Sequence, residues 1–285
     1  MKNRLYIKYF ESLIVALIAG NFILNIVLND YKVPHYDFRN IFFSIFIFFL
    51  LYFIGNSINQ LLDLESISFS IILYLISFFA FQFLFLFSQN ERFDFNLSFL
   101  IVNFLWSISI IFSRKRAAIQ NYIYAIFVYM AINLIKDFFG DKLFKNILKN
   151  GDVEYFWFPM TKMIYENNLN YALINNIEPG YGLLINNTYA VLGKLSLNIS
   201  NFEFSPSIIN VFLFLFILFV IEQEFSNSTK IILLILFFSI VVNSPWLSYL
   251  FTNSLMGEAV VNLFFPITLV MMTNNKFKTK KIRYF

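Results

Sequence analysis

The chain is built from repeated apolar stretches, each close to the length of a helix that crosses a lipid bilayer. Such a helix needs about 20 predominantly apolar residues. Eight stretches of this kind are predicted: Ser12–Leu28, Ile41–Leu62, Ile67–Ser88, Leu97–Ser113, Ala117–Ile135, Ile208–Ile221, Ile231–Val242 with its flanks, and Ala259–Met272. The sequence therefore predicts an all-α, polytopic integral membrane protein with about eight transmembrane helices, forming a single membrane domain over residues 1–285.

The composition agrees with this class and excludes several kinds of site. Only 13 % of the residues are charged, whereas soluble domains carry about 25 %. The chain has no cysteine, which excludes disulfides, thiolate metal sites and cysteine nucleophiles. Its single histidine, His35, rules out a histidine-cluster metal site. The net charge of +4 comes from basic residues at the ends of the stretches, so no nucleic-acid partner is expected.

The positions of the basic residues predict the orientation in the membrane. Lysine and arginine collect in cytoplasmic loops. With the N-terminus inside, the inside segments hold Lys2, Arg4, Lys8, Arg114, Lys115, Arg116, Lys230, Lys276, Lys278, Lys280, Lys281 and Arg283. We therefore expect a protein of the plasma (inner) membrane with both termini cytoplasmic, surrounded by membrane lipid. The loop over residues 137–204 then lies on the extracytoplasmic face.

This long loop holds two helix-like stretches and the residues best suited to chemistry. Tyr155–Tyr165 and Gly182–Leu195 are predicted to form short helices lying in the membrane interface. Asp152 and Glu154 precede them. A carboxylate beside a membrane can act as a general base, or hold a divalent cation such as Mg²⁺ or Mn²⁺. Both can also be ordinary acidic residues of a loop, and their spacing alone does not decide between these interpretations.

The surroundings of these carboxylates resemble a known family. Asp152 is followed by an aromatic run and by Pro159, which is similar to the first extracytoplasmic loop of GT-C glycosyltransferases, with Gly151 and Trp157 replacing the family's tryptophan and histidine. Residues 178–184 resemble the family's Pro-Pro-x-Tyr-Pro-x-Leu segment. Residues 243–258 resemble its second acidic loop, except that Asn253 stands where the family has aspartate, with Glu258 close by.

The resemblance implies an inverting membrane glycosyltransferase. Its donor would be a polyprenyl-phosphate-linked sugar, and its acceptor a glycan, lipid or protein on the extracytoplasmic face. Asp152 would be the general base, and Glu154 would support it or share a divalent cation with it. The resemblance and the aromatic or polar character of the neighbouring positions predict substrate contacts at Tyr155, Trp157, Lys162, Tyr181, Trp246, Asn253 and Glu258. Lys162 and Lys194 could bind a lipid phosphate or anchor at headgroup depth.

The resemblance covers Ala117–Met272 and leaves four predicted stretches, within residues 1–116, upstream of it. About four predicted stretches lie in the GT-C-like part, residues 117–285, whereas the family typically has seven or more. The alternatives are an incomplete gene product, a truncated transferase remnant, and a non-catalytic membrane protein of cell-envelope polysaccharide assembly or export. A polymerase or flippase is disfavoured because no charged residue lies near the middle of a predicted span.

One geometric prediction follows from the transferase hypothesis. A donor phosphate and an acceptor hydroxyl must be held together, so Asp152 should lie within about 10–12 Å of the segment Asn253–Glu258. The helix predicted to follow Asp152 should lie flat on the outer membrane surface.

Overall fold

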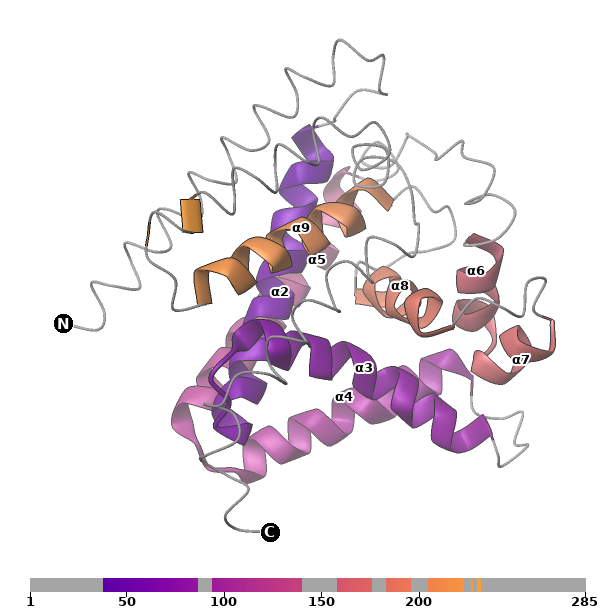
Figure 1. Ribbon diagram of the computed structural model, residues 1–285, viewed down its shortest axis with the longest axis horizontal. Coiled ribbons are helices and arrows are strands. Elements are labelled where there is room, and N and C mark those ends of the chain that lie inside the picture. Colours follow the sequence, from indigo (N-terminus) through magenta and orange to yellow (C-terminus); the bar gives the residue numbers. More distant parts are fainter. Residues whose placement is uncertain are drawn as a thin grey trace.

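The computed structural model describes residues 38–86, 94–139, 158–175, 183–195 and 205–222, together with residues 227, 230 and 231 (Figure 1). Its elements are helices, and no strand occurs among the described residues. The described residues form the helices α2 (Phe38–Leu62), α3 (Ile67–Leu86), α4 (Phe95–Phe112), α5 (Arg116–Phe139), α6 (Phe158–Glu166), α7 (Leu169–Ile174), α8 (Leu183–Leu195) and α9 (Ser205–Glu222).

Four of these helices are long and apolar enough to cross a membrane. The qualifying segments are Ser44–Leu62, Ile67–Leu84, Phe95–Phe112 and Arg116–Ile135. They coincide with the second to fifth predicted stretches, whose helical structure is thereby confirmed. The sixth stretch forms α9. The first and eighth stretches lie outside the described residues, as does the seventh apart from Ile231, so the total of eight spans stays a prediction.

The pairing of α2 with α3 depends on a glycine. A Cβ atom at Gly55 would lie inside van der Waals contact of Ile71 Cγ1 and 3.1 Å from the carbonyl oxygen of Ile67. The backbones of the two helices can therefore approach closely only because position 55 has no side chain. Small residues allow this kind of approach between helices in membranes, where packing replaces the hydrophobic effect as the driving force. On the side of α5, the Ser57 hydroxyl donates to the carbonyl oxygen of Ala118 at 2.6 Å.

Two tight turns lie at the same end of the bundle, which we call the turn end. The α2–α3 turn contains Asp63 at φ 51°, and the α4–α5 turn contains Arg114 at φ 55°. The Lys115 ammonium joins them, because it donates to Asp63 Oδ2 at 2.7 Å. It also donates to the carbonyl oxygens of Gln60 and Leu61, at 3.0 and 3.2 Å. These two carbonyls belong to the last turn of α2, where no intrahelical amide is available to them.

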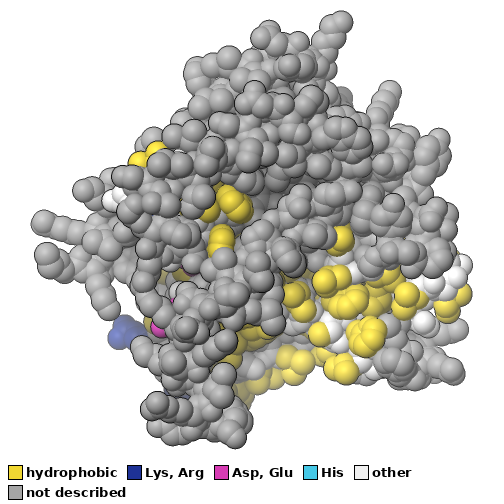
Figure 2. All heavy atoms as spheres, viewed as in Figure 1, with side chains coloured by type: hydrophobic (Ala, Val, Ile, Leu, Met, Phe, Trp, Pro, Cys, Tyr) yellow, Lys and Arg dark blue, Asp and Glu magenta, His cyan; other side chains and the backbone are white. Residues whose placement is uncertain are grey.

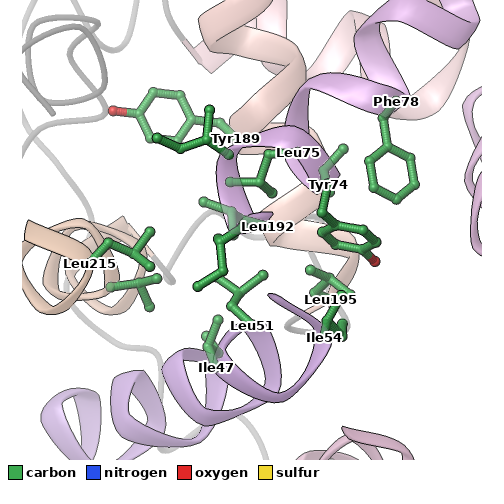
Figure 3. Packing of buried hydrophobic residues seen from close by; sticks show 14 of the residues in the cluster. Ile47, Leu51, Ile54, Tyr74, Leu75, Phe78, Tyr189, Leu192, Leu195 and Leu215 are labelled. Atoms are coloured by element: carbon green, nitrogen blue, oxygen red, sulfur yellow. The ribbon is translucent and has the colours of Figure 1, made fainter. Parts of the chain in front are cut away.

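The core combines apolar packing with interhelical hydrogen bonds. Leu192 and Leu195 of α8 point toward side chains of α2 and α3, as Figure 3 shows. Phe48 of α2 meets Phe214 of α9 edge-on, with ring centroids 5.7 Å apart. Between α3 and α4, the Tyr74 hydroxyl donates to Asn103 Oδ1 at 2.8 Å, and the Trp106 indole N–H donates to Ser77 Oγ at 3.1 Å.

The outer faces of α4 and α5 are apolar and exposed. Figure 2 shows hydrophobic side chains gathered over the region of α3 and α4. The exposed large apolar residues of α4 and α5 are Leu97, Leu100, Phe104, Leu105, Ile111, Phe112, Ile123, Tyr124, Ile126, Phe127, Met130 and Leu134. So many exposed large apolar side chains on two helices are unusual on a protein surrounded by water. It suits contact with lipid acyl chains, as the membrane prediction requires.

Candidate functional site

The helices of the long loop fold back onto the end of the bundle opposite the turn end, which we call the loop end. It is formed by the C-terminal end of α3 and the N-terminal end of α4 (Figure 1). The amide of Phe95 donates to the carbonyl oxygen of Asn167, in the α6–α7 turn, at 2.6 Å. The amide of Leu169 donates to Gln82 Oε1 at 3.2 Å. The long loop is therefore held to the apolar bundle by hydrogen bonds as well as by packing.

Local sequence explains where these helices begin. Pro159 lies in the first turn of α6, where the missing amide hydrogen costs nothing. Asn168 caps α7 by accepting from the amide of Tyr171 at 2.8 Å. Asp94 caps α4 in the same way, accepting from the amide of Leu97 at 2.7 Å. The helices α6 and α8 fall within or overlap the two stretches predicted to be helical, whereas α7 was not predicted. Their predicted location in the membrane interface stays a prediction.

The polar residues in the middle of α8 lie inside the protein. Asn186, Asn187 and Thr188 are all fully buried. The reason is that α8 packs against α3, α6, α7 and α9. The same three residues match an N-glycosylation sequon, and the burial of Asn186 keeps its side chain from a modifying enzyme.

Two buried side-chain amides, those of Gln82 and Asn187, meet where α8 packs against α3. Gln82 Nε2 donates to Asn187 Oδ1 at 2.6 Å, while Gln82 Oε1 accepts from the amide of Leu169. Asn187 Nδ2 and both polar atoms of Asn186 have no hydrogen-bond partner among the described residues. Buried polar atoms normally have partners, so these three atoms are exceptions in the described core.

A cation lies at the surface of the loop end. Lys194, in the last turn of α8, donates to Asn96 Oδ1 at 2.7 Å. Its ammonium also lies 5.4 Å from the ring centroid of Tyr165. None of the described carboxylates forms an ion pair with it. These contacts hold the Lys194 ammonium in one place at the C-terminal end of α8, where a positive charge also suits the helix dipole.

Of the residues predicted to act in catalysis or to contact the substrate, only Lys162 lies within the described parts of the chain. It is on α6, partly exposed, and its ammonium lies 3.6 Å from Glu166 Oε1. Asp152, Glu154, Tyr155, Trp157, Tyr181, Trp246, Asn253 and Glu258 lie outside the described residues. The predicted distance between Asp152 and the segment Asn253–Glu258 is therefore not tested.

No group of three or more potential metal ligands occurs among the described residues. The predicted pair Asp152 and Glu154 is not among those residues. A divalent cation at these two carboxylates therefore stays a prediction.

At the turn end, a carboxylate that the sequence analysis did not single out closes the N-terminal end of α3. Glu222, the last residue of α9, accepts from the amides of Ile67 and Ser68, at 2.6 and 3.2 Å. It also accepts from the hydroxyls of Ser66 and Ser68. Burial raises the pKa of the Glu222 carboxyl, and these hydrogen bonds, which favour its charged form, oppose that shift. The sequence gives little indication of this role, because a single acidic residue at the end of an apolar stretch is common. The donors that Glu222 accepts from belong to α3, which is far away in the sequence.

Comparison of the chain with protein-family models, with curated proteins and with solved structures finds no match.

Proposed function

We propose that the chain is a membrane glycosyltransferase of the GT-C type, which transfers a sugar from a polyprenyl-phosphate-linked donor on the extracytoplasmic face. One observation supports this most directly. The loop that carries the two family-like segments packs its helices onto one end of the bundle. The first segment begins at Asp152 and runs into α6 at Phe158, and the second contains Tyr181 and runs into α8 at Leu183. Each segment therefore leads directly into a helix that packs against the bundle.

The proposed reaction takes place at headgroup depth, at the loop end of the bundle. Asp152 takes the proton from an acceptor hydroxyl, whose oxygen attacks the anomeric carbon of the sugar. The bond between that carbon and the phosphate oxygen breaks, and the lipid phosphate leaves with the electron pair. Glu154 supports Asp152 or holds a divalent cation that neutralises the leaving phosphate. Lys194, fixed by Asn96 and Tyr165, supplies a positive charge at the same end of the bundle.

Replacing Asp152 with asparagine is expected to lower sugar transfer by about 10²- to 10⁴-fold, because the side chain no longer accepts a proton. Transfer is measured in membranes supplied with radiolabelled lipid-linked sugars. Asp94→Asn is the matched control. Asp94 is an acid at the loop end, and asparagine caps a helix as well as aspartate does. Full turnover by the Asp152 variant would remove the proposed base and favour the non-catalytic alternative.

The proposed orientation places the loop end outside the cell and the turn end in the cytoplasm. Single cysteines test it directly, because the native chain contains none. Ile174→Cys, on the exposed surface of α7, should react with a membrane-impermeant thiol reagent in intact cells. Glu65→Cys, exposed in the α2–α3 turn, should react only after the membrane is broken. The reverse pattern would show that the loop end faces the cytoplasm and would exclude an extracytoplasmic active site.

A further inference from the structure

The three consecutive basic residues of the α4–α5 turn have different environments. Lys115 is used within the fold, because its ammonium donates to Asp63 Oδ2 and to two carbonyl oxygens in the last turn of α2. Arg114 and Arg116 are exposed, and no described carboxylate forms an ion pair with either of them. The two arginines therefore present positive charge to the surroundings of the turn end, while the lysine between them stabilises the fold.

The backbone conformation at position 114 disfavours arginine. Its φ of 55° lies in the left-handed region, which glycine adopts without steric cost and other residues adopt rarely. Asp63 shares this conformation, but its ion pair with Lys115 offsets the cost. Arg114 has no comparable ion pair with a described residue. Local structure therefore favours glycine at this position and does not account for the arginine.

The electrostatics of α5 disfavour arginine at position 116. This residue begins α5, and the first turn of the helix contains no acidic residue. The N-terminal end of a helix carries a partial positive charge, which favours acidic side chains there and disfavours basic ones. The preference of cytoplasmic loops for basic residues explains a positive charge in this turn. It does not require two exposed arginines at positions that local structure disfavours, whereas an anion bound beside them would offset both costs.

The surroundings of the turn indicate a lipid as the source of this anion. The turn joins Phe95–Phe112 and Arg116–Ile135, which are both long and apolar enough to cross a membrane. Its charges therefore lie where the hydrocarbon of a bilayer ends and the headgroups begin. Ile111 and Phe112, just before the turn, are 57 % and 77 % exposed. A phospholipid offers acyl chains to these side chains and a phosphate to the arginines, whereas a dissolved anion offers only the charge.

We propose that Arg114 and Arg116 form a binding site for the headgroup of an anionic phospholipid. A guanidinium group matches the geometry of a phosphate, to which it can donate two hydrogen bonds. The headgroup must carry a net negative charge, because the ammonium of a zwitterionic headgroup cancels the charge of its phosphate. In the proposed orientation the turn end faces the cytoplasmic leaflet, whose surface is negative. The inference depends on the structure of this turn and not on the proposed transferase activity.

The test measures how an anionic lipid stabilises the purified full chain. The chain in detergent micelles is titrated with phosphatidylglycerol, and phosphatidylcholine with the same acyl chains is the zwitterionic control. Sodium phosphate is the control for a dissolved anion. Unfolding on heating is followed by the fluorescence of the three tryptophans. Phosphatidylglycerol should raise the apparent Tm by about 2–4 °C more than phosphatidylcholine does, because a ligand that binds only the folded state stabilises it. Sodium phosphate should leave the Tm unchanged.

Substitutions then locate the site. Arg114→Gln and Arg116→Gln should each raise the half-saturating concentration of phosphatidylglycerol about fivefold, and the double variant about 25-fold. Lys162→Gln removes the same charge at the loop end, from a residue paired with Glu166, and should change it by less than about twofold. Arg114→Gly should raise the Tm without lipid by about 2–4 °C, because glycine suits the left-handed backbone, and should still weaken lipid binding. A residue with a purely structural role would not give this combination.

The proposal is overturned if phosphatidylcholine stabilises the chain as much as phosphatidylglycerol, if sodium phosphate reproduces the shift, or if the double arginine variant binds the lipid like the wild-type chain. Equal weakening by Lys162→Gln and by the arginine variants would show a response to net charge alone and would also overturn it. A lower lipid-free Tm for Arg114→Gly would show that this arginine stabilises the fold itself. If the double variant does not fold, Arg114→Gly decides, since it removes a charge while relaxing the backbone.

Discussion

Replacing Gly55 with leucine is expected to destabilise the chain by about 3 kcal/mol or more, because a side chain at this position must displace α3. The nearest atoms to an added Cβ are Ile71 Cγ1 and the carbonyl oxygen of Ile67. Neither can move freely, since one belongs to a β-branched side chain in the core and the other to the backbone. The expected result is a lower apparent Tm in detergent, measured by tryptophan fluorescence.

Two further variants test whether this contact is the cause. Ala117→Leu adds an apolar side chain at an exposed position of α5 and should change stability by no more than about 0.5 kcal/mol. In Gly55→Ala, the clash with Ile71 opposes a gain in helix propensity of about 1 kcal/mol. Combining it with Ile71→Ala should give a coupling energy of about 0.5–3 kcal/mol, since the second change makes room for the first. An unchanged Tm for Gly55→Leu would contradict close contact between α2 and α3.

Replacing Glu222 with alanine is expected to have the largest effect of any polar substitution that we consider. The change removes the acceptor of two amides and two hydroxyls at the start of α3. Each buried donor left without an acceptor costs about 1–3 kcal/mol. The loss of negative charge at a helix N-terminus adds to this cost. We expect a large fall in Tm and separation of α9 from α3.

Glu166→Ala is the matched control for this prediction. Glu166 is 52 % exposed and forms a pair with Lys162 on its own helix, an interaction worth about 0.2–0.5 kcal/mol. Glu222→Gln should have an intermediate effect, because its side chain retains one acceptor oxygen and presents an NH₂ group to the remaining donors. Equal Tm values for Glu222→Ala and Glu166→Ala would show that the carboxylate does not hold α9 to α3.

The locations of the helices were predictable because they depend on local sequence. Uninterrupted apolar runs predicted the second to fifth helices to within a few residues at each end. Backbone groups in hydrocarbon must bond within their own segment, so a long apolar run can only form a helix. The pattern of apolar and polar residues over Tyr155–Tyr165 similarly predicted a helix in the region of α6. The two predicted catalytic residues, Asp152 and Glu154, were chosen from carboxylate chemistry and from a family resemblance, and both lie outside the described residues.

The sequence did not predict which faces of these helices pack against one another. A helix that is apolar all round has no polar stripe to show which side is inside, and α2 and α3 are of this kind. The roles of Gly55, Glu222 and Asn187 depend on partners far away in the chain. Glu222 meets Ile67 across 155 positions, and Asn187 meets Gln82 across 105. The sequence by itself determined which segments become helices, since that requires only bonds within each segment. Only the tertiary structure decided which polar groups find partners, because hydrogen bonds between distant segments exist only once the helices have packed.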